Sequence, residues 1–174
     1  MKKDKKYIIN IVFRIIFTLL LIFTCITIFD FSKQNGTSSG NLSRKVMENI
    51  ARIFTNNDEQ IATIVLKGEP ILRKIAHFYI YTSLGIWAMC MMQTYFKKET
   101  KNYDTVMKKR MFISILIGFI YASTDEIHQI FIPNRSAEVR DVFLDTLGVA
   151  NGVLLIAICV YIFKYYKNIT KELK

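Results

Sequence analysis

Long apolar runs separated by shorter polar stretches dominate the chain. Four of these runs have about 20 residues each, the length that an α-helix needs to cross the hydrocarbon core of a bilayer. Because a segment in hydrocarbon must satisfy its backbone hydrogen bonds internally, each run predicts a transmembrane helix. The four predicted spans are residues 7–29, 75–96, 111–132 and 142–163. The expected fold class is therefore all-α, with one domain over residues 1–174 built as a four-transmembrane-helix bundle.

The connection between the first two spans, residues 30–74, is too long to be a simple link. A polar start is followed by two apolar sets at helical spacing, which predict two short amphipathic helices. The second begins after an N-cap at Asn57 or Asp58 and ends near Pro70. The apolar sets are Val46, Ile50, Ile53 and Phe54, then Ile61, Ile64 and Val65. Two interpretations stay open: the helices lie on the bilayer surface, or they cap the bundle.

The placement of Lys and Arg predicts the orientation in the membrane. Basic residues number four in the first six positions, six in residues 97–110 and four in residues 164–174. The other two connections, residues 30–74 and 133–141, hold nine in 54 residues. The positive-inside rule places both termini in the cytoplasm and these two connections outside. The first run is longer than the usual signal-peptide core, so we expect it to be retained.

The composition excludes several classes of protein. Of 174 residues 52% are hydrophobic, and the formal charge of +10 is concentrated between the apolar runs. This segregation excludes a disordered chain and an ordinary soluble domain. Three cysteines inside apolar runs make no disulfide framework. The aromatic residues also lie within apolar runs, so no nucleic-acid partner is expected.

Polar residues inside the predicted spans form the main candidate site. Charges at this depth are costly and mark function or pairing. With the predicted orientation, polar groups of the second, third and fourth spans all fall in the outer leaflet, and helical spacing places several on common faces. The candidate functional cluster is Lys74, His77, Tyr81, Asp125, Glu126, His128, Gln129, Arg135, Asp141 and Asp145. A purely structural ion-pair network is the alternative interpretation.

The cluster does not match a known catalytic or metal motif. Asp125-Glu126-Ile127-His128 is not the His-Glu-x-x-His zinc motif, and no nucleophile elbow or P-loop is present. We therefore expect no metal and no cofactor. The carboxylates with a histidine can serve as general acid and base, but no nucleophile is evident. Catalytic residues stay unknown, and enzyme status is open, with a non-enzymatic protein favoured.

Two glycines, Gly148 and Gly152, form a small-xxx-small face on the fourth span. Such a face lets two helices approach closely. We expect it to serve helix packing, and it is also a candidate surface for an oligomer.

The same residues resemble those of the VanZ-like family of small integral membrane proteins. The resemblance covers roughly residues 71–152. It depends on Lys74-x-x-His77-Phe78-x-x-Tyr81-x-x-Leu84-Gly85, on Asp125-Glu126-x-His128-Gln129-x-Phe131-x-Pro133-x-Arg135, and on Asp141-Val142 with Gly148. The chain departs from the family pattern at Asn134, where the family usually has Gly, and at Asp145, where it usually has Asn.

The resemblance implies a protein of the bacterial plasma membrane that lowers susceptibility to lipoglycopeptide antibiotics such as teicoplanin. It does not define the mechanism. The partners that it suggests are membrane lipids and either the lipoglycopeptide or a lipid-linked cell-wall precursor. Two other functions stay open: an intramembrane enzyme acting on a lipid-linked cell-envelope substrate, and a small ion- or proton-coupled transporter.

Overall fold

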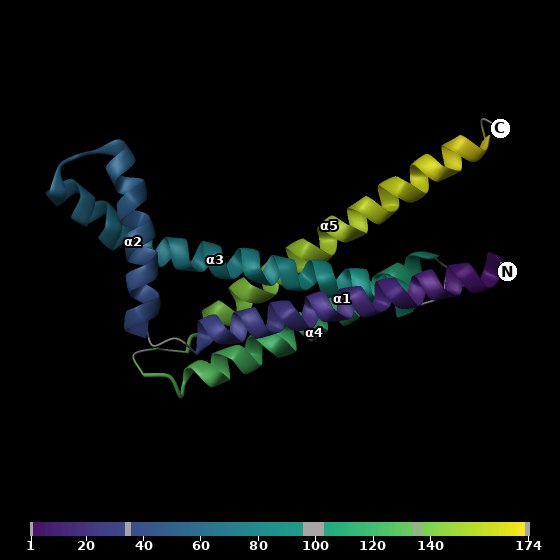
Figure 1. Cartoon of the computed structure of the whole chain (residues 1–174), viewed down its shortest axis with the longest axis horizontal. Helices are drawn as coiled ribbons and strands as arrows, with labels where there is room; N and C mark the ends of the chain where they lie inside the picture. The colour runs from purple at the N-terminus through teal and green to yellow at the C-terminus, as the bar shows by residue number, and fades with distance from the viewer. Residues whose placement is uncertain (1, 34–35, 96–102, 134, 136, 173–174) are drawn as a thin grey trace.

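In a computed structural model of the chain, every regular element among the described residues is an α-helix (Figure 1). The structure describes residues 2–33, 36–95, 103–133, 135 and 137–172. The helices are α1 (Lys2–Ser32), α2 (Gly36–Phe54), α3 (Asp58–Tyr95), α4 (Tyr103–Gln129) and α5 (Val139–Glu172). The expectation of an all-α protein is confirmed.

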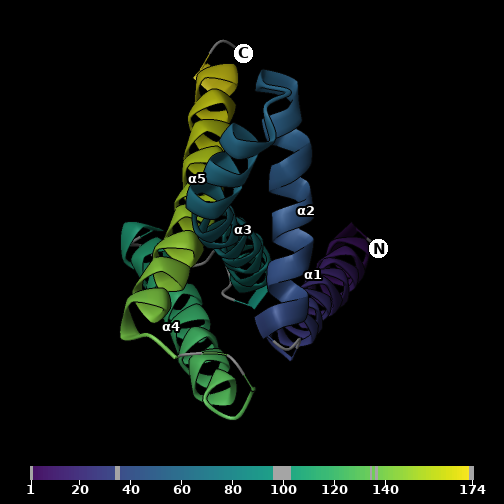
Figure 2. The same ribbon diagram turned by 90° about the vertical axis from the view of Figure 1, so that its left-hand side faces the viewer.

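The helix α3 forms the centre of the molecule and contacts the other four helices. Figure 2 shows α3 between α5 on one side and α1 and α2 on the other. The helix α5 packs on α3 and α4 over much of its length, with contacts to the start of α4 as far as Lys164, and its last turns diverge from the bundle (Figure 1). Both termini lie at one end of the molecule, and α2 lies at the opposite end (Figure 1).

Within the part of the chain that the structure describes, three helices are long and apolar enough to cross a membrane: residues 5–32 of α1, all of α3, and residues 139–171 of α5. The helix α4 is not among them, because charged residues stand at both ends of its apolar stretch, including Asp125 and Glu126. Large apolar side chains on α1 face outward, with Leu19 60% and Phe23 67% exposed. Exposure of this extent indicates a lipid-facing surface. The chain is therefore a membrane protein.

The two amphipathic helices predicted in residues 30–74 differ from the structure. The helix α2 begins at Gly36, earlier than its apolar pattern indicates. The predicted second loop helix and the predicted span from residue 75 are one continuous helix, α3, which passes through Pro70. Proline removes one backbone donor, but packing of α3 on both α2 and α5 supports the helix on either side of it. The predicted end of span 75–96 at Phe96 lies outside the described residues.

The start of α3 follows the predicted N-cap. The Asn57 side-chain oxygen accepts hydrogen bonds from the backbone N–H groups of Glu59, at 2.9 Å, and Gln60, at 3.3 Å. Just beyond it, Ile61 and Val65 of α3 pack on Ala51 of α2 in a small buried cluster. This part of α2 therefore packs on α3.

Close contact between α3 and α5 depends on glycine. A Cβ at Gly152 would overlap the carbonyl oxygen of Thr82, and a Cβ at Gly85 would overlap that of Val149. At Gly148 a Cβ would lie 2.5 Å from the carbonyl oxygen of Phe78. The Gly148/Gly152 face is thus covered by α3 of the same chain. The expectation that this face also serves an oligomer stays a prediction.

Candidate functional site

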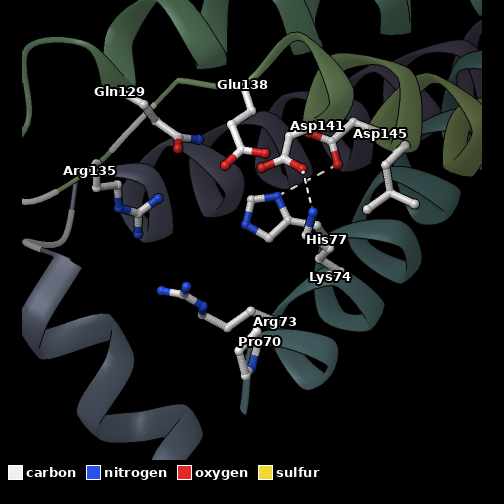
Figure 3. Close-up of a pocket in the computed structure, with 10 residues that line it drawn as sticks. Pro70, Arg73, Lys74, His77, Gln129, Arg135, Glu138, Asp141 and Asp145 are labelled. Carbon is white, nitrogen blue, oxygen red and sulfur yellow. Dashed lines mark ion pairs between the residues drawn. The ribbon is translucent and has the colours of Figure 1, made fainter. Parts of the chain in front are cut away.

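The polar residues of three helices meet at the end of the molecule opposite the termini. The helix α3 contributes its fourth to sixth turns, α4 its last turns, and α5 its first two turns, with the connection before α5 closing the site (Figure 3). Because α4 runs toward this end while α5 runs away from it, the end of one and the start of the other lie together.

Two ion pairs join α3 to α5, and Figure 3 marks both. The Nζ atom of Lys74 lies 3.3 Å from Oδ1 of Asp141, and Nδ1 of His77 lies 3.6 Å from Oδ1 of Asp145. Lys74 and His77, three residues apart on α3, therefore meet Asp141 and Asp145, four residues apart on α5. The first pair is partly exposed, whereas Asp145 is fully buried.

A second buried carboxylate, Asp125, connects α4 to α3. Its Oδ2 accepts hydrogen bonds from the Tyr81 hydroxyl, at 3.3 Å, and from the Gln129 side-chain amide, at 3.1 Å. Glu126 faces another neighbour, since its Oε2 accepts a 3.0 Å hydrogen bond from the backbone N–H of Glu138. Glu126 thus holds the connection before α5 against the end of α4.

Several buried carboxylate oxygens lack a hydrogen-bond partner among the described residues. They include Oδ1 of Asp125, Oε1 of Glu126 and Oδ2 of Asp145, on side chains that are at most 5% exposed. Buried polar atoms are almost always hydrogen-bonded, and an unpaired one costs about 1–3 kcal/mol. These oxygens can therefore accept a hydrogen bond from a ligand.

A polar cavity of about 170 Å³ lies at this meeting point (Figure 3). Six residues of the predicted cluster line it: Lys74, His77, Gln129, Arg135, Asp141 and Asp145. Tyr81, Asp125 and Glu126 are not among the lining residues, but they support residues that are. The predicted convergence of the second, third and fourth spans therefore appears in the structure as one cavity.

His128 is separated from the rest of the predicted cluster. Its Nδ1 lies 3.5 Å from Oγ of Ser32, and its ring lies 4.7 Å from that of Phe29, both on α1. The imidazole therefore contacts α1 instead of the cavity. Asn134, where the family usually has Gly, lies outside the described residues.

Four lining residues were not predicted: Pro70, Arg73, Glu138 and Leu144. Two of them carried a signal in the sequence. Arg73 stands four residues before His77 on α3 and shares its helical face, and Glu138 lies in the connection just before α5, three residues before Asp141. The predicted spans begin at residues 75 and 142, whereas α3 and α5 begin earlier, at Asp58 and Val139. The extension of both helices toward this end was therefore not predicted.

Arg135 closes the cavity from the connection between α4 and α5. Its Nη2 donates a 2.9 Å hydrogen bond to the backbone carbonyl of Phe31 at the end of α1. Burial lowers the pKa of the Arg135 guanidinium from its ordinary value, but an arginine stays charged in proteins. Arg135 therefore ties α1 to the site and keeps a positive charge there.

The arrangement is suited to binding charged groups. Cationic and anionic side chains face one cavity, so a ligand with a polar headgroup can contact both kinds. Among the described residues, no group of three or more His, Cys, Asp or Glu side chains is placed to hold a metal ion.

Comparison with protein families identifies the chain. The family model described as VanZ/LLP1 matches residues 16–161. The chain belongs to the VanZ/LLP1 family. The match runs from α1 into α5 and includes every residue of the cavity, which confirms the resemblance drawn from the motifs. Comparisons with curated proteins and with solved structures found no match.

Proposed function

We propose that this VanZ/LLP1 protein lowers susceptibility to lipoglycopeptide antibiotics of the teicoplanin type. In this proposal α1, α3, α4 and α5 all cross the bacterial plasma membrane, both termini are cytoplasmic, and the cavity lies beneath the outer headgroups. Family membership supports the class of protein. The density of Lys and Arg near the termini supports the orientation.

The observation that carries the proposal is the convergence of charged side chains from α3, α5 and the connection before α5 on one cavity. Charged groups in the membrane cost about 2.5–3.5 kcal/mol each on insertion scales. A cluster that surrounds a cavity favours a binding role over a purely structural one. Teicoplanin-type drugs carry a fatty chain and act on cell-wall precursors outside the membrane. A polar cavity at this depth can therefore engage the drug or the precursor headgroup.

The test is expression in a sensitive Gram-positive host, followed by measurement of the inhibitory concentrations of teicoplanin and vancomycin. We expect a larger increase for teicoplanin, because vancomycin lacks the lipid chain that would place it at the membrane. Equal increases for the two drugs, or none, would contradict the proposal.

A pair of variants tests whether the teicoplanin shift depends on the cavity. Asp141→Asn removes a charge that lines the cavity, and Asp104→Asn removes one near the start of α4, where it pairs with the Tyr161 hydroxyl. With equal amounts in the membrane, Asp141→Asn should reduce the teicoplanin shift and Asp104→Asn should leave it unchanged.

A second candidate is an intramembrane enzyme acting on a lipid-linked cell-envelope substrate. The buried carboxylates of Asp125 and Glu126, each with an unpartnered oxygen, favour it, because general acids and bases are often buried carboxylates. Asp125→Asn and Glu126→Gln should then each abolish the phenotype. Variants that reach the membrane normally and keep full tolerance would exclude this candidate.

A further inference from the structure

A second cavity opens beside the polar one, between α1, α2 and α3. Its volume is about 340 Å³ and its walls are mainly apolar. Sites of about 300–1,000 Å³ commonly hold small molecules. The apolar lining comes from Ile28 and Phe31 of α1, Leu42 and Val46 of α2, and Leu72 and Ile80 of α3. We call this cavity the apolar groove.

The polar cavity and the apolar groove share three lining residues: Arg73, His77 and Arg135. The cavity's carboxylates, Glu138, Asp141 and Asp145, line only the polar side. The junction between the two spaces is therefore lined by two guanidinium groups and an imidazole. Figure 3 shows Arg73 and Arg135 pointing from different elements toward the same space.

Both guanidinium groups keep donors available for a ligand. Arg73 faces Glu69 through Nε at 3.6 Å, and Arg135 donates to the Phe31 carbonyl through Nη2. Each guanidinium carries five N–H donors in a geometry that fits phosphate oxygens. The neighbouring Asp141 and Asp145 are paired with Lys74 and His77, so they oppose an anion at the junction less than unpaired carboxylates would.

We infer that the junction binds the phosphate of an anionic phospholipid, with one of its acyl chains in the apolar groove. Arg73 and Arg135 hold the phosphate, and α1, α2 and α3 enclose the chain. The polar cavity then receives the remainder of the headgroup. This inference rests on the proposed function only in placing this end of the protein in the outer leaflet.

The test is native mass spectrometry of the purified full-length protein in detergent, titrated with phosphatidylglycerol. Phosphatidylcholine with identical chains tests the need for net negative charge, and inorganic phosphate tests the need for the chains. We expect phosphatidylglycerol to bind about tenfold more tightly than phosphatidylcholine, because the choline cation cancels the net negative charge that the two guanidinium groups attract. Inorganic phosphate should not bind measurably.

Variants test separately the two arginines at the junction and the apolar groove. Arg73→Gln and Arg135→Gln should each weaken phosphatidylglycerol binding about tenfold. Arg52→Gln is the matched control, since Arg52 lies on the exposed face of α2 and pairs with Glu48. Leu72→Trp fills the groove and should weaken both lipids. Helical content measured by circular dichroism identifies variants that fail to fold, and Arg73→Lys, which retains the charge, should recover part of the affinity.

Three outcomes would overturn the inference: equal binding of the two lipids, equal losses in Arg52→Gln and Arg73→Gln, or inorganic phosphate binding as tightly as lipid. The assay contains no antibiotic. Lipid binding without a teicoplanin shift therefore contradicts only the proposed function, and a shift without lipid binding contradicts only this inference.

Discussion

The pair of His77 and Asp145 allows the cluster to be tested quantitatively by a double-mutant cycle. His77→Ala removes the only ion-pair partner that the described residues give to Asp145, a side chain with no exposed surface. Breaking a fully buried pair costs about 3–5 kcal/mol. His77 is 34% exposed, so we reduce this to about 2 kcal/mol, the range of a charged hydrogen bond.

Asp145→Asn should behave differently. The amide keeps the shape of the side chain and removes the charge, so we expect a loss of about 0.5 kcal/mol. In the double variant no charge is left without a partner, and the loss should stay near 0.5 kcal/mol instead of the additive value of about 2.5 kcal/mol. The expected coupling is therefore about 2 kcal/mol, or roughly 30-fold in the unfolding equilibrium.

The assay is reversible unfolding of the purified protein in mixed micelles, followed by circular dichroism. The control cycle combines His128→Ala with Asp145→Asn, because His128 contacts Phe29 and Ser32 on α1. This cycle should be additive within about 0.5 kcal/mol. Additivity in the His77 cycle as well would refute the ion pair and the reasoning built on it.

Two further substitutions test the packing around the site by the same unfolding assay. Tyr81→Phe removes the hydrogen bond to Asp125 and should cost about 1–2 kcal/mol, whereas Tyr79→Phe, at a 66% exposed residue, should cost less than about 0.5 kcal/mol. Gly152→Val places side-chain atoms against the Thr82 carbonyl and should cost about 1–3 kcal/mol, whereas Leu154→Ile on the exposed side of α5 should have little effect. Equal losses within either pair would show that the assigned contact is absent.

The sequence was sufficient to place at one depth the residues that form the pairs between α3 and α5, but not to match the partners. Lys74 and His77 share one helical face, as do Asp141 and Asp145, and the two helices run away from the same end. Spacing therefore placed both partners of each pair at the same depth. The close approach of these helices was also signalled, by Gly148 and Gly152.

The polar residues of α4 contact different neighbouring elements, and these neighbours could not be predicted in the same way. Spacing fixes the angle between side chains on one helix, but not which neighbouring helix each one meets. In the structure α4 contacts α1, α3 and α5. Gln129 thus meets Asp125 beside α3, Glu126 meets the connection before α5, and His128 meets α1.

Long-range packing explains the remaining differences. Pro70 indicated the end of a helix, yet α3 continues through it between α2 and α5. At the other end of the molecule, the side chains of Asn10 and Arg14 donate hydrogen bonds of 3.0 Å and 2.8 Å to the carbonyl of Thr94. These contacts join residues more than 70 positions apart, and no local pattern predicts them.

The most direct test of the account is the side of the membrane on which the cavity lies. In a variant without its three cysteines, Ala137→Cys places one thiol beside Glu138 at the cavity, and Lys164→Cys places one on α5 toward the end that carries the termini. A membrane-impermeant maleimide added to intact cells should label Ala137→Cys and should label Lys164→Cys only after the cells are opened. Labelling of Lys164→Cys alone in intact cells would contradict an outward-facing cavity.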